Sequence, residues 1–340
     1  MSTYIVRRLL QAVPLLILIS MVVFGLIALA PGGVGEMYEG NPNISAADAA
    51  RLEAQLGLDQ PLYIRYWHWA RRVAVGDWGT SLVTRRPVLA EIGARLPYTL
   101  QLMSTAFVVM LLIALPIGVH SALHPYSLFD HVATFWAFVG QAIPIFWFGL
   151  LLIMLFNVLL HNPTSPSTGF AWSHLWDCAD CKPLLPGGGV APYDVITPTV
   201  GQRLQHLILP VSMLALLGAG SYTRYLRGQM LEVIHLDYIR TARAKGLPER
   251  RIVWGHALRN AMTPLVTLLA LDLPGLFGGA LFTETIFSWP GMGRLFYQHA
   301  QRSDYPVLMG IVMVNAGLII LFNLLADILY AYLDPRVRYG

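Results

Sequence analysis

Cysteine and histidine are the first residues to consider for chemistry in this chain. Cys178 and Cys181 stand in a Cys-Ala-Asp-Cys string, and such a pair can close a small disulfide on the oxidising outer face of a membrane or supply half of a metal site. The other metal ligands would have to come from His161 or His174, and the spacing is not that of a zinc finger. We therefore expect a disulfide or two unpaired thiols here, and no metal site.

Asp272 is the only charged residue inside any of the long apolar segments of the chain. An ionisable side chain at membrane depth is costly, so two interpretations stay open: a neighbouring helix or subunit satisfies Asp272, or Asp272 lines a translocation pathway and meets a substrate amine. An intramembrane enzyme would need a nucleophile with its base, or a metal cluster, at that depth. His120, His161 and His206 lie near segment ends instead, which disfavours an enzyme. An ion channel is disfavoured as well, because the sequence has no filter-like loop.

ATP and nucleic acid have no recognisable binding sequence in this chain. A phosphate-binding loop of the Gly-x-x-x-x-Gly-Lys-Ser/Thr type occurs nowhere in the 340 residues. Only two of the 23 cationic residues are lysines, and no dense basic patch indicates nucleic-acid binding. If ATP drives this protein, ATP and Mg²⁺ bind to partner subunits, and we expect no cofactor on this chain.

The composition is that of an integral membrane protein. The chain has 56% apolar and only 12% charged residues, with a mean hydropathy of +0.56, whereas soluble domains carry about 25% charged residues. The first apolar run is longer than the roughly 7–15 residues of a signal-peptide core, so we expect an uncleaved anchor. Six segments reach the length of about 20 residues that a transmembrane helix needs. They are Leu9–Ala30, Tyr98–Leu123, Val132–Leu160, Leu204–Thr223, Asn260–Thr283 and Tyr305–Ala326.

Six spans place both termini on one side of the membrane, and charge favours the cytoplasmic side. With this orientation the cytoplasmic parts hold 12 cationic and 6 acidic residues, against 11 and 12 outside. Seven of the outer arginines lie in residues 31–98, which exceed the roughly 60 residues to which the positive-inside rule applies. We thus divide the chain into a tail and first helix (1–30), an extracytoplasmic helical segment (31–97) and a five-helix core (98–340) with a cytoplasmic loop at 224–259.

The outer segment should be folded. Ser45 and Asp48 resemble a capping box, and Gly57 followed by Pro61 ends a short helix. The stretch YIRYWHWARRVAV (63–75) gathers aromatic residues of the kind found at headgroup level. It predicts an interfacial helix, and the alternative is a surface that contacts peptide.

The segment from Glu232 to Pro264 is the longest cationic stretch between two apolar spans. Residues 238–245 predict a short helix that Gly246 and Pro248 end, because glycine suits a left-handed cap and proline cannot continue a helix. A second helical piece should run over 249–262. A short, capped surface helix between two membrane spans suggests a lever that another protein grips.

The sequence DYIRTARAKGL (237–247), followed by HALRNA (256–261), resembles the coupling loop of dipeptide/oligopeptide permeases, membrane subunits of bacterial ABC importers. Arg240, Thr241 and Ala242 take the positions of the Glu-Ala-Ala pattern, from which the first two depart, and Gly246 is its glycine. Three outer strings are also similar to this family: GLDQPL (57–62), GDWGTS (76–81) and ETIFSWPGMG (284–293). The resemblance covers nearly the whole chain except residues 161–203.

This resemblance implies an all-α integral membrane protein with six transmembrane helices, the type I ABC importer permease fold and a folded extracytoplasmic segment after the first helix. It implies a multi-pass protein of the bacterial cytoplasmic membrane that pairs with a sister permease, two ATP-binding subunits and an extracytoplasmic substrate-binding protein. ATP-driven alternating access would then import di- or oligopeptides. The same architecture in this family also imports nickel complexes, glutathione, aminolevulinate or oligosaccharides.

The resemblance also assigns roles to residues. The helix that couples to the ATPase would contain Asp237, Tyr238, Arg240, Thr241, Ala242, Arg243, Lys245 and Gly246, with Asp237, Arg240, Arg243 and Lys245 making polar contacts and Ala242 and Gly246 allowing close approach. An outer loop over the pathway would contain Glu284, Phe287, Trp289, Pro290 and Gly291. The Trp-Pro-Gly part suits a plug or docking edge, and a simple packed turn explains it as well.

Overall fold

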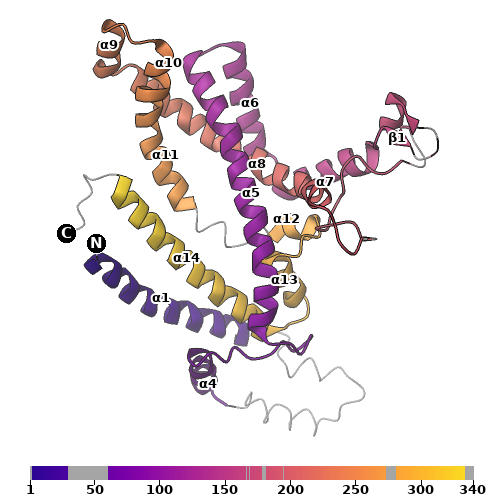
Figure 1. The fold of residues 1–340 in the computed structure, drawn as a ribbon. Helices are drawn as coiled ribbons and strands as arrows, with labels where there is room; N and C mark the ends of the chain where they lie inside the picture. The colour runs from indigo at the N-terminus through magenta and orange to yellow at the C-terminus, as the bar shows by residue number, and fades with distance from the viewer. Residues whose placement is uncertain are drawn as a thin grey trace. The chain divides into compact units, whose positions relative to one another are not determined.

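A computed structural model describes residues 2–29, 60–165, 167, 169–177, 181–193, 195–272 and 281–333. Their contacts divide the chain into two units. One combines residues up to Pro97 with Leu295–Leu324, and the other combines Tyr98–Arg294 with Leu325–Arg338. Among the described residues the regular elements are helices, apart from one antiparallel pair of two-residue strands (Figure 1). The elements are α1 Ser2–Leu29, α4 Leu62–Ala74, α5 Val88–Leu123, α6 Leu128–Ala142, α7 Ile145–Ile153, η1 Met154–Leu159, β1 Thr164–Ser165, β2 Gly169–Phe170, η2 Trp172–Leu175, α8 Val200–Ile234, α9 Asp237–Ala244, α10 Glu249–Arg251, η3 Ile252–Ala257, α11 Leu258–Asp272, α12 Leu281–Ile286, α13 Met292–Ala300 and α14 Tyr305–Leu333.

Four described helices are long and apolar enough to cross a membrane: Val6–Leu29, Val88–Leu123, Val200–Ile234 and Tyr305–Ile328. Helix α6 and the piece formed by α7 and η1 pass the same test together, and their bend fits a broken span or a re-entrant loop. The four helices match four of the six predicted segments, and the bent pair matches a fifth. The sixth, Asn260–Thr283, runs over residues 273–280, which lie outside the described residues. The predicted capping box at Ser45 and the Gly57 helix end lie outside them too.

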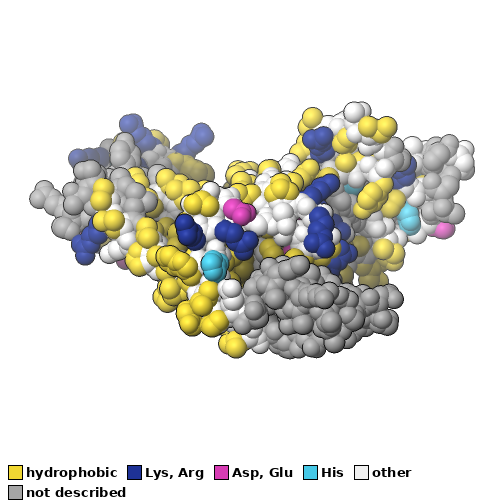
Figure 2. Space-filling model, turned by 90° about the horizontal axis from the view of Figure 1, so that it is seen from below, with side chains coloured by type: hydrophobic (Ala, Val, Ile, Leu, Met, Phe, Trp, Pro, Cys, Tyr) yellow, Lys and Arg dark blue, Asp and Glu magenta, His cyan; other side chains and the backbone are white. Residues whose placement is uncertain are grey.

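Apolar side chains cover much of the surface of these helices. Leu10, Leu18 and Leu26 of α1 are all more than half exposed, and Figure 2 shows hydrophobic side chains over much of the visible face. Soluble proteins rarely expose continuous apolar patches of this kind. The exposed surface is therefore consistent with contact to lipid or to other membrane helices.

The first unit packs α4 against α1. Tyr66 and Trp69 of α4 lie 5.6 and 5.8 Å from the ring of Phe24, and the Tyr66 hydroxyl lies 2.8 Å from Ser20 Oγ. Trp67 on the opposite side is exposed. The predicted helix at 63–75 is thus confirmed within one residue at each end. Two of its aromatic side chains contact α1, and Trp67 is exposed.

A buried carboxylate ties the GDWGTS string to the start of α14 in the same unit. Asp304 accepts hydrogen bonds from Ser81 Oγ at 2.5 Å and from the Leu82 backbone N–H at 3.1 Å. His299 Nδ1 lies 2.9 Å from the same carboxylate. Ser81 and Asp304 are fully buried, so this network fixes the loop before α5 on the beginning of the last helix.

In the second unit α8 is the central helix, because α6, α7, α11 and α12 all pack against it. It begins with a capping box, in which Thr199 and Gln202 each bond the other's backbone N–H. Its Gly220 lies directly against Ala137 of α6, where an added Cβ would come within 2.8 Å of the Ala137 Cα. Small residues at such positions let membrane helices approach closely.

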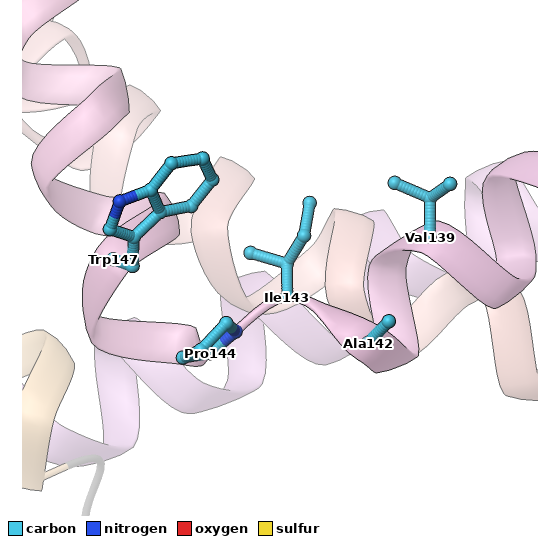
Figure 3. Close-up of a pocket in the computed structure, with 5 residues that line it drawn as sticks. All are labelled: Val139, Ala142, Ile143, Pro144 and Trp147. Atoms are coloured by element: carbon cyan, nitrogen blue, oxygen red, sulfur yellow. The ribbon is translucent and has the colours of Figure 1, made fainter.

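The predicted span Val132–Leu160 is broken near its middle. α6 and α7 meet at an angle of 105°, because Pro144 has no backbone N–H to continue α6 and holds Ile143 in an extended conformation with ψ of 126°. In contrast, α5 continues through Pro116 without interruption. The bend leaves an open apolar hollow of about 380 Å³. Figure 3 shows that the side chains of Val139, Ile143 and Trp147, which line this hollow, project to the same side of the backbone.

Candidate functional site

The helix α9, predicted to couple to an ATPase, spans Asp237–Ala244 and so agrees with the predicted bounds within one residue. It ends because Gly246 adopts the left-handed conformation, with φ of +74°, and Pro248 follows directly. The next piece differs from its predicted end at Met262. It continues through α10 and the π-helical turn η3 into α11 as far as Asp272.

α9 has one buried and one exposed face. Ile239 and Ala242 are 0% and 8% exposed and pack into the apolar cluster that contains Met230 and Val253. Ala242 was expected to allow close approach of a partner, but its side chain contacts the core of its own chain. The other residues assigned to the coupling helix are all exposed: Asp237, Tyr238, Arg240, Thr241, Arg243, Lys245 and Gly246.

Ion pairs on this exposed face are few and open to solvent. Arg243 donates to Glu249 at 2.6 Å and Arg240 donates to Asp237 at 3.2 Å. The hydrogen bond from Arg243 lowers the pKa of the Glu249 carboxyl below its ordinary value. Exposed pairs of this kind contribute about 0–1 kcal/mol to stability, so a partner could replace them at little cost.

Residues 284–294 run from the end of α12 to the start of α13, and we call them the outer turn after their predicted position. This turn is built around the carboxylate of Glu284. Glu284 is fully buried; it accepts from Thr99 Oγ1 at 2.7 Å and from the Arg294 backbone N–H at 3.1 Å. Thr99 Oγ1 in turn accepts from the Met292 N–H at 2.7 Å. Burial raises the pKa of Glu284 above its ordinary value, although these hydrogen bonds oppose the shift.

The aromatic residues of the outer turn are buried anchors. Phe287 and Trp289 are 0% and 1% exposed, and the indole N–H of Trp289 donates to the Tyr98 carbonyl at 2.9 Å. Of the five residues predicted to lie over a pathway, only Pro290 is partly exposed, while Glu284, Phe287, Trp289 and Gly291 are buried. A packed turn, one of the two interpretations of this string, therefore describes the single chain better than an exposed plug.

Two glycines of the turn are required by this packing. A Cβ at Gly291 would collide with the Glu284 carboxylate, and a Cβ at Gly293 would lie 2.7 Å from the Leu281 Cα. Real Cβ atoms do not approach that closely without rearrangement of the neighbours. The Trp-Pro-Gly-Met-Gly spacing therefore follows from the need to fold the chain closely around a buried carboxylate.

The glycine-rich part of the loop 161–203 packs closely against the outer turn and is hydrogen-bonded to it, a contact that the sequence did not predict. Gly189 N–H donates to the Phe287 carbonyl at 2.8 Å, and His206 Nδ1 lies 2.9 Å from the Gly188 carbonyl oxygen. A Cβ at Gly188 would lie 2.8 Å from the Phe287 carbonyl oxygen. The run of three glycines at 187–189 was the available signal, because backbone that approaches this closely excludes side chains.

The cysteine string is only partly described. Cys181 is disulfide-bonded, and Cys178, the only other cysteine of the chain, lies outside the described residues. His174 Nδ1 lies 3.1 Å from the Pro163 carbonyl oxygen. Among the described residues no group of three or more His, Cys, Asp or Glu could hold a metal ion.

Asp272 ends α11 with an exposed side chain and accepts a hydrogen bond from the Tyr222 hydroxyl of α8. A neighbouring helix therefore supplies a partner for the carboxylate, as one of the two interpretations required. Contact with a substrate amine stays a prediction.

Two arginines of α8 make polar contacts with α6 that the sequence did not predict. Arg227 donates from Nε and Nη2 to the two carboxylate oxygens of Asp130 at 2.6 and 2.7 Å. One turn earlier, Arg224 Nη2 donates to Gln141 Oε1 at 2.7 Å, and Gln141 Nε2 donates to Ser221 Oγ at 2.6 Å. These pairs link residues about 80 to 97 positions apart, so no local pattern reveals them.

Comparison with known proteins matches both parts of the chain. Residues 114–339 match the family described as binding-protein-dependent transport system inner membrane component, and residues 1–103 match the N-terminal region of such components. The oligopeptide transport system permease protein AppB of Bacillus subtilis is 42% identical over the full length of both chains. The dipeptide permease DppB of Escherichia coli K12 is 40% identical over 100% of this chain and 99% of its own, and the glutathione permease GsiC of Salmonella typhi is 36% identical over both full lengths.

Proposed function

Because the chain belongs to the family of binding-protein-dependent transport system inner membrane components, we propose that it forms half of the translocation pathway of an ABC importer for di- and oligopeptides. Relatives named as oligopeptide and dipeptide permeases, 42% and 40% identical over the whole chain, carry this proposal. The chain itself is a transport subunit and not an enzyme. Glutathione, the substrate in the name of a relative at 36% identity, is the second candidate and is itself a peptide.

The proposed assembly contains this chain, a sister permease, two ATPase subunits that bind ATP and Mg²⁺, and an extracytoplasmic substrate-binding protein. The chain crosses the bacterial cytoplasmic membrane six times with both termini inside. The exposed face of α9 supports the ATPase contact, since it presents Arg240, Arg243 and Lys245 outward while Ile239 anchors the helix to its own core. ATP binding closes the ATPase pair, α9 moves with it, and the membrane helices alternate between outward and inward access.

The proposal is tested by purifying the chain from its native membrane in mild detergent and identifying the proteins that accompany it by mass spectrometry. We expect a second permease and two ATPase chains, and ATP-dependent uptake of dipeptides when the assembly and its binding protein are reconstituted into liposomes. Recovery of the chain alone, or as a homo-oligomer, under conditions that preserve other importers would contradict the assembly. A complete importer that takes up no peptide would contradict the substrate class only.

A further inference from the structure

Arg224 and Arg227 lie one turn apart on α8 and face the same helix, but their guanidinium groups are satisfied differently. Arg227 uses its Nε–Nη2 edge to hold both oxygens of Asp130, at 2.6 and 2.7 Å. Asp130 is 3% exposed and also accepts the Tyr126 backbone N–H at 2.9 Å. This bidentate pair is complete within the chain, and it joins α6 to α8.

The same edge of Arg224 is only half satisfied. Nη2 donates to Gln141 Oε1 at 2.7 Å, whereas the adjacent Nε is buried and has no hydrogen-bond partner among the described residues. A carboxamide offers a single acceptor oxygen, so Gln141 cannot do what the Asp130 carboxylate does for Arg227. The guanidinium carbon lies 4.5 Å from the centre of the Phe138 ring, which holds the group in place without neutralising its charge.

Part of the surroundings of Arg224 is open at the surface of the chain, although α6 packs against this side of α8. Ser221, Tyr225 and Gln141 are exposed, while Tyr222, Thr223 and Leu226 on the other side of α8 are buried. Arg224 directly follows the predicted span Leu204–Thr223, so it lies at the cytoplasmic end of that span in the proposed topology. An imported peptide has to pass this end of the pathway to reach the cytoplasm.

We propose that Arg224 binds the C-terminal carboxylate of the imported peptide. This inference rests on the proposed function and names the residue that recognises a group which di- and oligopeptides share. The carboxylate takes the place of the Gln141 oxygen and accepts from both Nε and Nη2, in the geometry that Asp130 has with Arg227. A contact with the terminal carboxylate is independent of the side chains of the peptide, which suits a permease that serves many sequences.

Substitutions of Gln141 test this directly, because a structural role and a binding role predict opposite rankings of peptide uptake for the variants Gln141→Glu and Gln141→Ala. If Arg224 binds substrate, Gln141→Glu supplies an internal carboxylate that competes with the peptide, and uptake falls about tenfold, while Gln141→Ala stays within about twofold of the unchanged chain. If the Gln141–Arg224 contact only holds α6 to α8, Gln141→Glu retains uptake and Gln141→Ala lowers it. Uptake of radiolabelled alanylphenylalanine by the reconstituted importer is the measurement. Higher uptake by Gln141→Glu than by Gln141→Ala would overturn the inference.

A second comparison uses alanylphenylalanine and its C-terminal amide with the same binding protein. Arg224→Gln should lower uptake of the free acid about tenfold more than uptake of the amide. Arg227→Gln is the matched control and should lower both substrates equally, since it breaks a pair inside the chain. Equal loss for both substrates in Arg224→Gln would contradict the inference while leaving peptide import intact. Absence of all peptide uptake in the unchanged importer would overturn the proposed function and this inference together.

Discussion

The outer turn and the coupling segment around α9 are both short helical turns that contain glycine, yet they treat their polar groups in opposite ways. In the outer turn, Glu284 is fully buried and accepts hydrogen bonds from Thr99 and Arg294. In α9 the polar side chains point outward, and the ion pairs that they form are exposed. A buried, satisfied network fixes a structure, whereas an exposed face on a firmly anchored helix is available to another protein.

Gly291 of the outer turn and Gly246 after α9 show the same difference between a buried and an exposed position. At Gly291 an added Cβ meets the Glu284 carboxylate, so this glycine serves packing. At Gly246 an added Cβ meets nothing within 4 Å, and the only constraint inside the chain is the positive φ of +74°. Substitutions should therefore act on stability in the outer turn and on coupling in α9.

Removal of the buried carboxylate should have the largest effect. Glu284→Ala leaves the Thr99 hydroxyl and the Arg294 N–H without acceptors, each costing about 1–3 kcal/mol. We expect a large fall in the unfolding temperature of the detergent-purified protein. Glu284→Gln keeps the volume and one acceptor oxygen, so its loss should be clearly smaller. Equal unfolding temperatures for Glu284→Ala and the unchanged protein would show that the turn does not depend on this network.

Substitution of Gly246 should abolish transport with a modest loss of stability. Gly246→Trp forces a non-glycine residue to φ of +74°, at a cost of about 1–2 kcal/mol, and adds bulk to the exposed side of the joint. We expect normal membrane insertion with loss of ATPase assembly or of substrate-stimulated ATP hydrolysis. Gly246→Ala carries the same strain without the bulk and separates the two causes. Full peptide uptake by Gly246→Trp would refute the assignment of α9.

The two buried carboxylates of the outer parts should respond to pH in opposite directions. Burial raises the pKa of Glu284, so its contribution to folding is complete below the ordinary value and declines as pH rises towards the raised one. For Asp304, burial alone would raise the pKa, but hydrogen bonds from Ser81, Leu82, His299 and Val83 together lower it. Its contribution is present above the ordinary value and is lost as pH falls through the lowered one.

Unfolding temperatures of detergent-purified protein, recorded as a function of pH, test this. Asp304→Asn should remove part of the loss of stability in acid, and Glu284→Gln should remove part of the decline as pH rises above the ordinary glutamate range. Unchanged pH profiles in both variants would contradict the electrostatic account of these sites.

The ion pair beside α9 should have the smallest effect on stability. Glu249→Gln removes the partner of Arg243, which lies 2.6 Å away, and exposed pairs contribute about 0–1 kcal/mol. We expect an unfolding temperature close to that of the unchanged protein, together with a changed salt dependence of ATPase assembly. A large loss of stability would mean that this face is part of the fold and not a free surface.

Local patterns predicted the elements well and long-range contacts poorly. Gly246 and Pro248 determine the end of α9 through their own backbone preferences, and Pro144 breaks its helix for the same reason. By contrast, Pro116 does not interrupt α5, because a longer helix can absorb one missing donor when neighbouring helices hold it in place.

The buried hydrogen bonds and ion pairs join residues that lie far apart in the sequence, and no motif spacing predicts such pairs. Thr99 and Glu284 are 185 residues apart in the chain, and the Arg227–Asp130 pair spans 97 residues. The string ETIFSWPGMG was recognised from its resemblance, but its burial depends on α5 and on the glycine-rich loop. Likewise, the burial of Ala242 depends on the packing of α9 against η3, which the spacing of its residues does not predict.

Photocrosslinking from a photoreactive residue in place of Arg240 tests the central claim, that the exposed face of α9 contacts an ATPase. In native membranes we expect a crosslinked product with the mass of this chain plus an ATPase subunit, identified by mass spectrometry. A matched probe at Ile196, which is 99% exposed in the outer loop, should give no such product. Crosslinks from Arg240 to lipid only, or ATPase crosslinks of equal yield from both positions, would contradict the claim.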